Sequence, residues 1–426
     1  MRLSELLNIN ALERLVADKY INVRTHPTLP LRIYNYGPLA QINRHWPYEV
    51  CQCRGLIVDD QDNVVSRPMF KFFNLNQEAF LPMKDGWENV ILSEGFLIRS
   101  SQWWGNTLSI TEKIDGMMGV LYEWNGSYGI ATRGSFTSEG AIWASEKFQK
   151  FVKYGAVEHL PKGWTLIFEI VAKHLRIVVP YNFEGLVLLT AVNNETGEEA
   201  TYPELHHIWS QLNQYAKNKP WCRLVDKFDA TLVQCVADAK SDKEGEGYVV
   251  SVARKGLPPI KAKVKLEEYL RIHRMVFGTT AQMIWETIGD PLKPLLKHEA
   301  DEGLAPAEFR KWVLDWDQKL HKEFHKILFR VMEMTHAVRY VEVALKHDEG
   351  KIHEFLQMRE KELAGIALEL WHGNVSDAYH SIWKLVRPMG REDPRYPRDV
   401  FREEGEGEGE GENEAEEAVF DLRPVN

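Results

Sequence analysis

The chain has 426 residues, 44% of them hydrophobic, and a formal net charge of −10. This length allows two domains with full cores, and the hydrophobic content is ordinary for a soluble globular protein. Five Arg and thirteen Asp or Glu give residues 391–426 a net charge of −8, so residues 1–390 carry only −2. That balance excludes a surface that is basic throughout and coats nucleic acid, but it allows a local basic site.

No stretch of the sequence predicts a signal peptide or a membrane span. The N-terminus has no long apolar stretch after a basic start, and no run approaches 18 apolar residues. The four cysteines form no Cys-x-x-Cys pair, so a zinc ribbon is not expected, and so few thiols fit a reducing cytosol. We therefore expect a cytoplasmic protein that makes no membrane contact.

Residues 1–270 are predicted to form mainly strands and hairpins. Strands at 120–124 and 127–132 flank Asn125-Gly126, a pair typical of a type I′ turn. Two further hairpins are predicted, one from strands 185–192 and 200–202, the other from strands 246–253 and 260–264 around a turn at 254–259. Short helices are predicted at 138–154 and 203–217.

The pattern becomes helical near Leu266. One face of a helix is predicted by apolar residues at steps of three and four: Val313, Trp316, Leu320, Phe324, Leu328 and Val331. We expect an all-helical domain over residues 271–388. Residues 389–426 are expected to form an acidic disordered tail, because 403–417 is largely Glu and Gly and has almost nothing to bury.

The run Thr-Glu-Lys-Ile-Asp-Gly-Met places Lys113 one residue before Asp115 and Gly116, a spacing typical of enzymes that attach AMP or GMP to a lysine. A lysine attacks only when neutral, which at pH 7 costs roughly 4.6 kcal/mol unless nearby cations lower the cost. Lys263 and Lys265 alternate on one strand face and could act in this way, or neutralise an attacked phosphate. The alternative is an edge strand protected by lysines.

Two acidic residues stand out in the predicted strands. Glu246, before Gly247 at a strand start, suits a carboxylate ligand for Mg²⁺; the alternative is a solvated acid at a turn. Glu169 is the single acid of an apolar strand and would need a cation or hydroxyl if buried; the alternative is an outward-facing residue. His321 and His325, four residues apart, are interpreted as solvent-facing helix residues rather than as a metal pair.

Cations and an aromatic precede and follow the lysine run. Arg54 and Lys71 are of the kind that hold the β- and γ-phosphates of a triphosphate, and Phe73 could pack near the base. Arg133, before Gly134-Ser135, adds another cation. Taken one at a time, they could equally be surface cations and core aromatics.

In their order, these motifs resemble the phage-type RNA ligase 1 family of ATP-dependent RNA ligases, within the covalent nucleotidyltransferase superfamily. The resemblance covers residues 30–275. The matching stretches are Tyr34-Asn35-Tyr36, Cys53-Arg54-Gly55, 66–76, Lys113-Ile114-Asp115-Gly116, Arg133-Gly134-Ser135, 168–172, 194–198, Glu246-Gly247-Tyr248-Val249 and Lys263-Val264-Lys265. One departure is Met117, where the family usually has a small hydroxyl residue.

The resemblance implies a role for each matching residue. Lys113 would take AMP, with Lys263 and Lys265 at the α-phosphate. The ATP-binding residues would be Tyr34, Arg54, Lys71, Phe73, Asp115, Gly116, Arg133, Glu169 and Gly247. The metal-handling acids would be Glu169 and Glu246.

The implied fold is α+β, with an antiparallel-sheet, ATP-grasp-like nucleotidyltransferase domain (1–270) followed by the helical domain, which would govern RNA choice. The implied activity joins 5′-phosphate and 3′-hydroxyl RNA ends through lysyl-AMP and RNA-adenylate, in RNA repair, with ATP as substrate and Mg²⁺ or Mn²⁺ as metal. We expect a monomer, with an end-healing kinase-phosphatase as a candidate partner. The alternatives are a catalytically impaired RNA-end-binding module, a DNA ligase and a capping-type enzyme.

Overall fold

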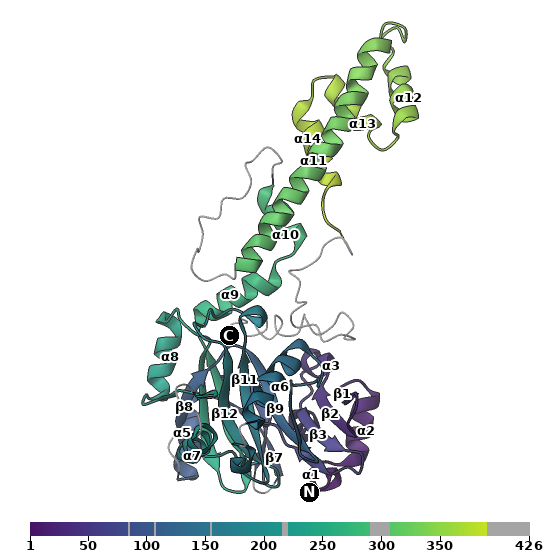
Figure 1. Cartoon of the computed structure of the whole chain (residues 1–426). Helices are drawn as coiled ribbons and strands as arrows, with labels where there is room; N and C mark the ends of the chain where they lie inside the picture. Colours follow the sequence, from purple (N-terminus) through teal and green to yellow (C-terminus); the bar gives the residue numbers. More distant parts are fainter. Residues whose placement is uncertain (84–85, 106–107, 154–155, 215–219, 290–306, 390–426) are drawn as a thin grey trace. The chain divides into compact units, whose positions relative to one another are not determined.

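The computed structural model describes the chain except for residues 84–85, 106–107, 154–155, 215–219, 290–306 and 390–426 (Figure 1). The described residues form two compact units, which divide between Arg274 and Met275. The acidic tail predicted at 389–426 lies, apart from Met389, outside the described residues. Among the helices described, none has the length and apolar character to cross a bilayer.

The first unit is built on four sheets. The N-terminal sheet has the order β1 (Ile21–Thr25), β2 (Leu31–Tyr36), β3 (Arg54–Asp59), β4 (Val64–Ser66). A five-stranded sheet has the order β10 (Ser127–Ala131), β9 (Met117–Trp124), β11 (Trp164–Val171), β12 (Gly185–Asn193), β13 (Cys222–Leu224). A second has the order β14 (Lys227–Phe228), β8 (Ser109–Lys113), β15 (Gly247–Arg254), β16 (Leu257–Lys265), β5 (Phe73–Asn74), and β6 (Glu78–Met83) pairs with β7 (Gly86–Ile91). All neighbours are antiparallel except β12 with β13 and β16 with β5.

Helices surround these sheets in the first unit and make up the second. Those before residue 267 are α1 (Leu3–Leu6), α2 (Ile9–Ala17), α3 (Pro38–Ile42), α4 (Tyr48–Gln52), α5 (Glu94–Trp103), α6 (Glu139–Val152), α7 (Tyr202–Asn213) and α8 (Leu232–Ser241), with 3₁₀ turns at Ala156–His159 and Lys173–Leu175. Those after it are α9 (Glu267–Gly278), α10 (Ala281–Ile288), α11 (Ala307–Val341), α12 (Glu349–Arg359), α13 (Ala364–Trp371) and α14 (Val375–Leu385). The predicted α+β class, with an antiparallel-rich first part and a helical C-terminal part, is confirmed.

The first predicted hairpin forms as expected, whereas the other two differ in detail. Asn125 and Gly126 join β9 to β10 with φ of 49° and 78°, as a type I′ turn requires. The expected strand at 200–202 is wrong: a single bridge joins Val192 to Glu199, and the Thr201–Glu204 capping box then starts α7.

The turn between β15 and β16 is also shorter than expected. It contains only Lys255 and Gly256, so Pro258 and Pro259 lie inside β16. Proline is tolerated there because the register shifts between Val252 and Arg254, which leaves an irregular stretch without a regular ladder.

Apolar contacts hold the N-terminal sheet against the sheet that contains β9 and β11. Ile33 and Ile57 pack in one cluster with Met118, Val120 and Ile167, all 7% exposed or less. This packing sets β3, which begins at Arg54, against the start of β9, which follows the lysine run.

In the second unit, α11 buries the face that the sequence predicts. Val313, Leu320, Phe324 and Val331 are at most 7% exposed. His325 is exposed as expected, but His321 is not solvent-facing: its Nδ1 lies 3.0 Å from Oδ1 of the fully buried Asp317, and its side chain is 12% exposed. A buried carboxylate needs such a partner, which explains the difference.

Candidate active site

Lys113 ends β8 beside the start of β15 and the end of β16. Gly247 is paired with Lys113 on one side and with Lys265 on the other. Its φ is +141°, and a Cβ atom there would lie 2.1 Å from the carbonyl oxygen of Val264. Glycine is therefore required for the three strands to approach this closely.

Glu246 joins two of the predicted lysines. Its Oε2 lies 2.6 Å from Nζ of Lys113, and its Oε1 lies 3.5 Å from Nζ of Lys265. Glu246 is only 3% exposed, so it is not a solvated acid at a turn. The carboxylate fixes the position of the Lys113 amine.

Asp115 anchors the segment that follows the lysine. Its buried carboxylate accepts hydrogen bonds from the backbone N–H groups of Val178 and Val179, at 2.8 and 2.7 Å, and from the Tyr269 hydroxyl at 2.9 Å. Burial, with the nearby charge of Glu246, outweighs these hydrogen bonds and raises the pKa of Asp115 to about 6. Asp115 therefore ties the lysine segment to Tyr269 in α9, four residues after Lys265.

Gly116 and Met117 follow at a close crossing with β11. A Cβ atom on Gly116 would lie 2.5 Å from the carbonyl oxygen of Ile170, so a side chain cannot fit. Met117 packs toward Gly140 at the start of α6, where a Cβ atom would lie 2.4 Å from its Cε. The residue that departs from the family pattern is thus accommodated by a glycine.

Glu169 lies in the middle of β11, paired with Met118. Burial raises the pKa of Glu169 to about 8, with Glu246 and Asp115 acting in the same direction and Lys113 and Arg54 opposing them. The negative charge of Glu246 therefore raises the pKa of both Asp115 and Glu169 next to the lysine.

Neighbouring carboxyl groups of this kind can hold a divalent cation once they are ionised. Carboxylate oxygens are the ligands that Mg²⁺ and Mn²⁺ prefer, and Glu169 and Glu246 are the two with the strongest claim. Within the residues that the structure describes, no group of three or more His, Cys, Asp or Glu is arranged as a metal cage. A metal here would keep open positions for phosphate oxygens and water, as Mg²⁺ commonly does.

Arg54 lies beside the segment that follows Lys113, and Lys71 lies in a buried aromatic box. Nη1 of Arg54 is 3.3 Å from Sδ of Met118, directly after Met117. Nζ of Lys71 lies 4.3 to 5.1 Å from the ring centroids of Trp46, Phe73 and Tyr36, and Lys71 is 3% exposed. Phe73 thus packs against Trp46 and Lys71, and its buried ring forms part of that box.

Tyr36, rather than Tyr34, contacts the predicted cations. Tyr34 is buried in the N-terminal core, where burial raises its pKa. The Tyr36 hydroxyl accepts a hydrogen bond from Nη1 of Arg133 at 3.1 Å, and its ring lies next to Lys71. Of the two tyrosines in the matching stretch, Tyr36 is therefore the one linked to Lys71 and Arg133.

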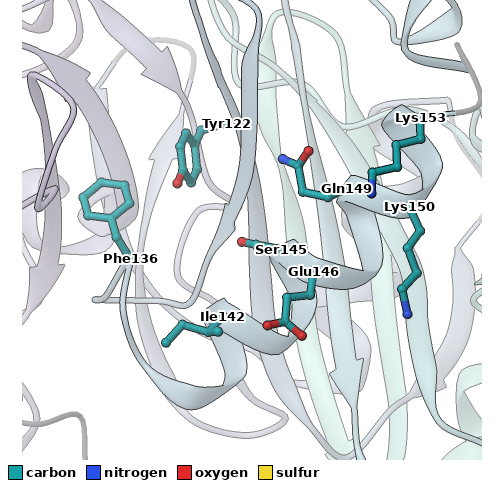
Figure 2. A pocket seen from close by; sticks show the side chains of 8 residues that line it. All are labelled: Tyr122, Phe136, Ile142, Ser145, Glu146, Gln149, Lys150 and Lys153. Carbon is teal, nitrogen blue, oxygen red and sulfur yellow. The ribbon is translucent and has the colours of Figure 1, made fainter.

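A cavity of about 530 Å³ lies along α6, away from these residues (Figure 2). Tyr122 and Phe136 line one side, and the other is lined from α6 and the residue after it: Ile142, Ser145, Glu146, Gln149, Lys150 and Lys153. None of the predicted site residues lines it, so it is separate from the cluster around Lys113.

Three residues of the cluster were missed from the sequence. Tyr36 was passed over because two tyrosines share its stretch, and the bulge between Tyr34 and Asn35 that separates them is not visible in a sequence. Tyr269 falls within the predicted first domain, residues 1–270, but no motif in the sequence marks it, and the structure places it in the first turn of α9. Lys261 continues the alternation of Lys263 and Lys265, a signal that the sequence did offer.

Comparison with known proteins finds similarity to RNA ligases. The model of the RNA ligase family matches residues 52–270. A protein of Autographa californica nuclear polyhedrosis virus that carries the name of a bifunctional polynucleotide kinase/RNA ligase is 28% identical over 64% of this chain, and an RNA ligase of Rhodothermus phage RM378 is 26% identical over 32% of it. The matches span 38% and 36% of those proteins.

Among solved structures, an archaeal ATP-dependent RNA ligase aligns with a TM-score of 0.41 and 11% identity, over 72% of this chain and 70% of that one. The family match covers more than half of the chain, and its range includes Lys113, Glu246 and the β16 lysines. The chain therefore belongs to the RNA ligase family of the phage RNA ligase 1 type.

Proposed function

We propose that this protein is an ATP-dependent RNA ligase that works through a covalent AMP on Lys113. The observation that carries the proposal is the cluster of Lys113, Glu246 and Lys265, joined by contacts of 2.6 and 3.5 Å at a three-strand junction. The carboxylate holds the lysine in a fixed position, and the second ammonium group can neutralise a phosphate under attack.

The proposed reaction has three steps. The neutral amine of Lys113 attacks the α-phosphorus of ATP, the bond to the β-phosphate oxygen breaks, and pyrophosphate leaves. The AMP then passes to the 5′-phosphate of an RNA end, and finally a 3′-hydroxyl attacks that end and releases AMP. Lys265 and Lys263 neutralise the α-phosphate in the transition state, where a preorganised charge contributes most.

Glu246 positions the amine of Lys113. Asp115 holds the segment after the nucleophile through Val178, Val179 and Tyr269. A divalent cation held by Glu169 and Glu246 would supply further neutralisation of the phosphate charge. Arg133, Tyr36 and Lys71 form a connected group that we assign to nucleotide binding.

We propose that the helical domain predicted at residues 271–388 selects RNA ends, and that residues 389–426 take no part in nucleotide chemistry. The name of the viral relative, which combines a polynucleotide kinase with an RNA ligase, supports an end-healing kinase-phosphatase as the supplier of 5′-phosphate ends.

Labelled nucleotides and ends separate this proposal from its alternatives. Incubation with labelled ATP and a divalent metal should label the protein, and a 5′-phosphorylated RNA should then be joined to a 3′-hydroxyl end. Labelling by GTP would indicate a capping-type enzyme, and sealing of nicked DNA in preference to RNA a DNA ligase. Absence of any label would support an impaired RNA-end-binding module.

A further inference from the structure

Lys261 is a third lysine on the face of β16 that carries Lys263 and Lys265. Alternate residues of a strand face the same way and are separated by about 6.6 Å. Lys265 lies level with Lys113, since both pair with Gly247, whereas Lys261 pairs with Ser251, four residues further along β15. The three lysines thus lead away from the nucleophile along one line.

Three cations surround the ring of Phe72, the residue before β5. Nζ of Lys261 lies 5.1 Å from the ring centroid, Nζ of Lys263 lies 5.5 Å from it, and Cζ of Arg54 lies 5.6 Å from it. The ring face attracts cations, but it does not cancel three positive charges. This group, Arg54, Lys261 and Lys263 around Phe72, is the Phe72 cradle.

One buried carboxylate offsets part of this charge. Oε2 of Glu199 lies 2.7 Å from Nζ of Lys261, and both side chains are about 10% exposed. Glu199 follows the turn 193–198 and is joined to β12 only by the bridge to Val192. The Lys261 ammonium also lies 3.5 Å from Sδ of Met69.

We propose that Lys261 joins Arg54 at the terminal phosphates of the nucleoside triphosphate, with Lys263 of the Phe72 cradle between them and the α-phosphate, and that Lys261 exchanges Glu199 for a phosphate oxygen when the nucleotide enters. The inference rests on the proposed function and deepens it. In phosphoryl transfer the leaving group departs roughly in line with the attacking group, on the opposite side of the phosphorus. With Lys113 at one end of the lysine row, pyrophosphate leaves toward Lys261, and Lys71, inside its aromatic box, is not needed for that contact.

A purely structural role for the pair makes a different prediction from a phosphate-binding role. If Lys261 and Glu199 only clamp β16 to the turn at 193–199, removing either charge should have the same effect. If Lys261 binds phosphate, Glu199 competes with it, so the two substitutions should act in opposite directions on ATP binding.

The test measures KM for ATP in lysyl-AMP formation by Lys261→Met, Glu199→Gln and the control Lys255→Met, an exposed lysine in the β15–β16 turn. Lys261→Met should raise KM about tenfold or more, since it removes a charge-assisted contact, while Glu199→Gln should leave KM unchanged or lower it. Sealing of chemically pre-adenylated RNA, which needs no triphosphate, should match wild type in both variants. Equal increases in KM for both variants, a wild-type KM for Lys261→Met, or equal loss of sealing would overturn the proposal.

Binding of inorganic tripolyphosphate, measured by calorimetry, tests the cradle without chemistry. Lys261→Met should bind it about tenfold more weakly than wild type and Lys255→Met should not. If wild type forms no lysyl-AMP yet shows this difference, the proposed function fails and the cradle stands. If lysyl-AMP forms and tripolyphosphate binds Lys261→Met as it binds wild type, the cradle fails and the proposed function stands.

Discussion

Tyr269→Phe removes a single hydroxyl from the support of the nucleophile segment, and its effect should depend on pH. The hydroxyl donates a 2.9 Å hydrogen bond to the buried Asp115 carboxylate, while the ring stays in place beside Lys265. Hydrogen bonds to charged groups contribute about 1.5–3 kcal/mol, against about 1 kcal/mol for a neutral pair. The loss of unfolding free energy should therefore be larger when Asp115 is ionised.

The direction in which stability changes with pH follows from the pKa of Asp115. Folding raises this pKa to about 6, above the unfolded value, so wild type loses stability as pH rises from about 4 to 6 and then levels off. In Tyr269→Phe the ionised carboxylate loses a donor, its pKa rises further, and the loss of stability should continue to higher pH. Relative to wild type, the variant should thus lose about 1 kcal/mol of unfolding free energy at pH 5 and about 1.5–3 kcal/mol at pH 8.

The assay is urea unfolding of both proteins at pH 5 and pH 8, repeated in an Asp115→Asn background. Asparagine cannot titrate, so in that background the cost of Tyr269→Phe should be the same at both pH values. A cost that is equal at pH 5 and pH 8 with Asp115 present, or a pH dependence that persists without it, would refute the reasoning.

Three further predictions follow from the site. Gly247→Ala would place a Cβ atom 2.1 Å from the carbonyl oxygen of Val264 and should destabilise the protein by about 1–3 kcal/mol more than the control Gly86→Ala. Gly86 has the same φ of +141° but open space around it, so equal shifts in melting temperature for the two variants would argue against the clash. Because the pKa of Glu169 is raised to about 8, metal binding below pH 8 must release the proton of this carboxyl group. The affinity for Mn²⁺, measured by titration calorimetry, should therefore rise up to about tenfold per pH unit toward pH 8, and Glu169→Gln should remove this rise. Deletion of residues 391–426 should leave the rate of lysyl-AMP formation unchanged; a large decrease in a labelled-ATP assay would give the tail a role that its composition does not predict.

The sequence predicts the strand-rich first part and the helical second part because periodicity and turn residues are local signals. Asn125-Gly126 specifies its turn, and the apolar steps of α11 specify its buried face. The extra strand at 200–202 was wrong because the Thr201–Glu204 capping box favours a helix start over a return strand.

The candidate site was only partly accessible from the sequence. Lys113, Glu246 and Lys265 meet because strand register places Gly247 between them, and register over 130 residues is a property of the whole fold. The same holds for Tyr269 and Asp115, which are 154 residues apart in the chain. Local patterns identify the residue types, and only tertiary pairing decides which of two tyrosines contacts Arg133.

The central claim is that Lys113 carries the nucleotide, and the most direct test is intact-mass measurement after incubation with ATP and a divalent metal. Wild type should gain the mass of one AMP, the control Lys255→Ala should gain the same mass, and Lys113→Ala should gain none. Peptide mapping should place the added mass on the tryptic segment that contains Lys113. An AMP adduct that persists in Lys113→Ala, or that maps to another lysine, would contradict the account.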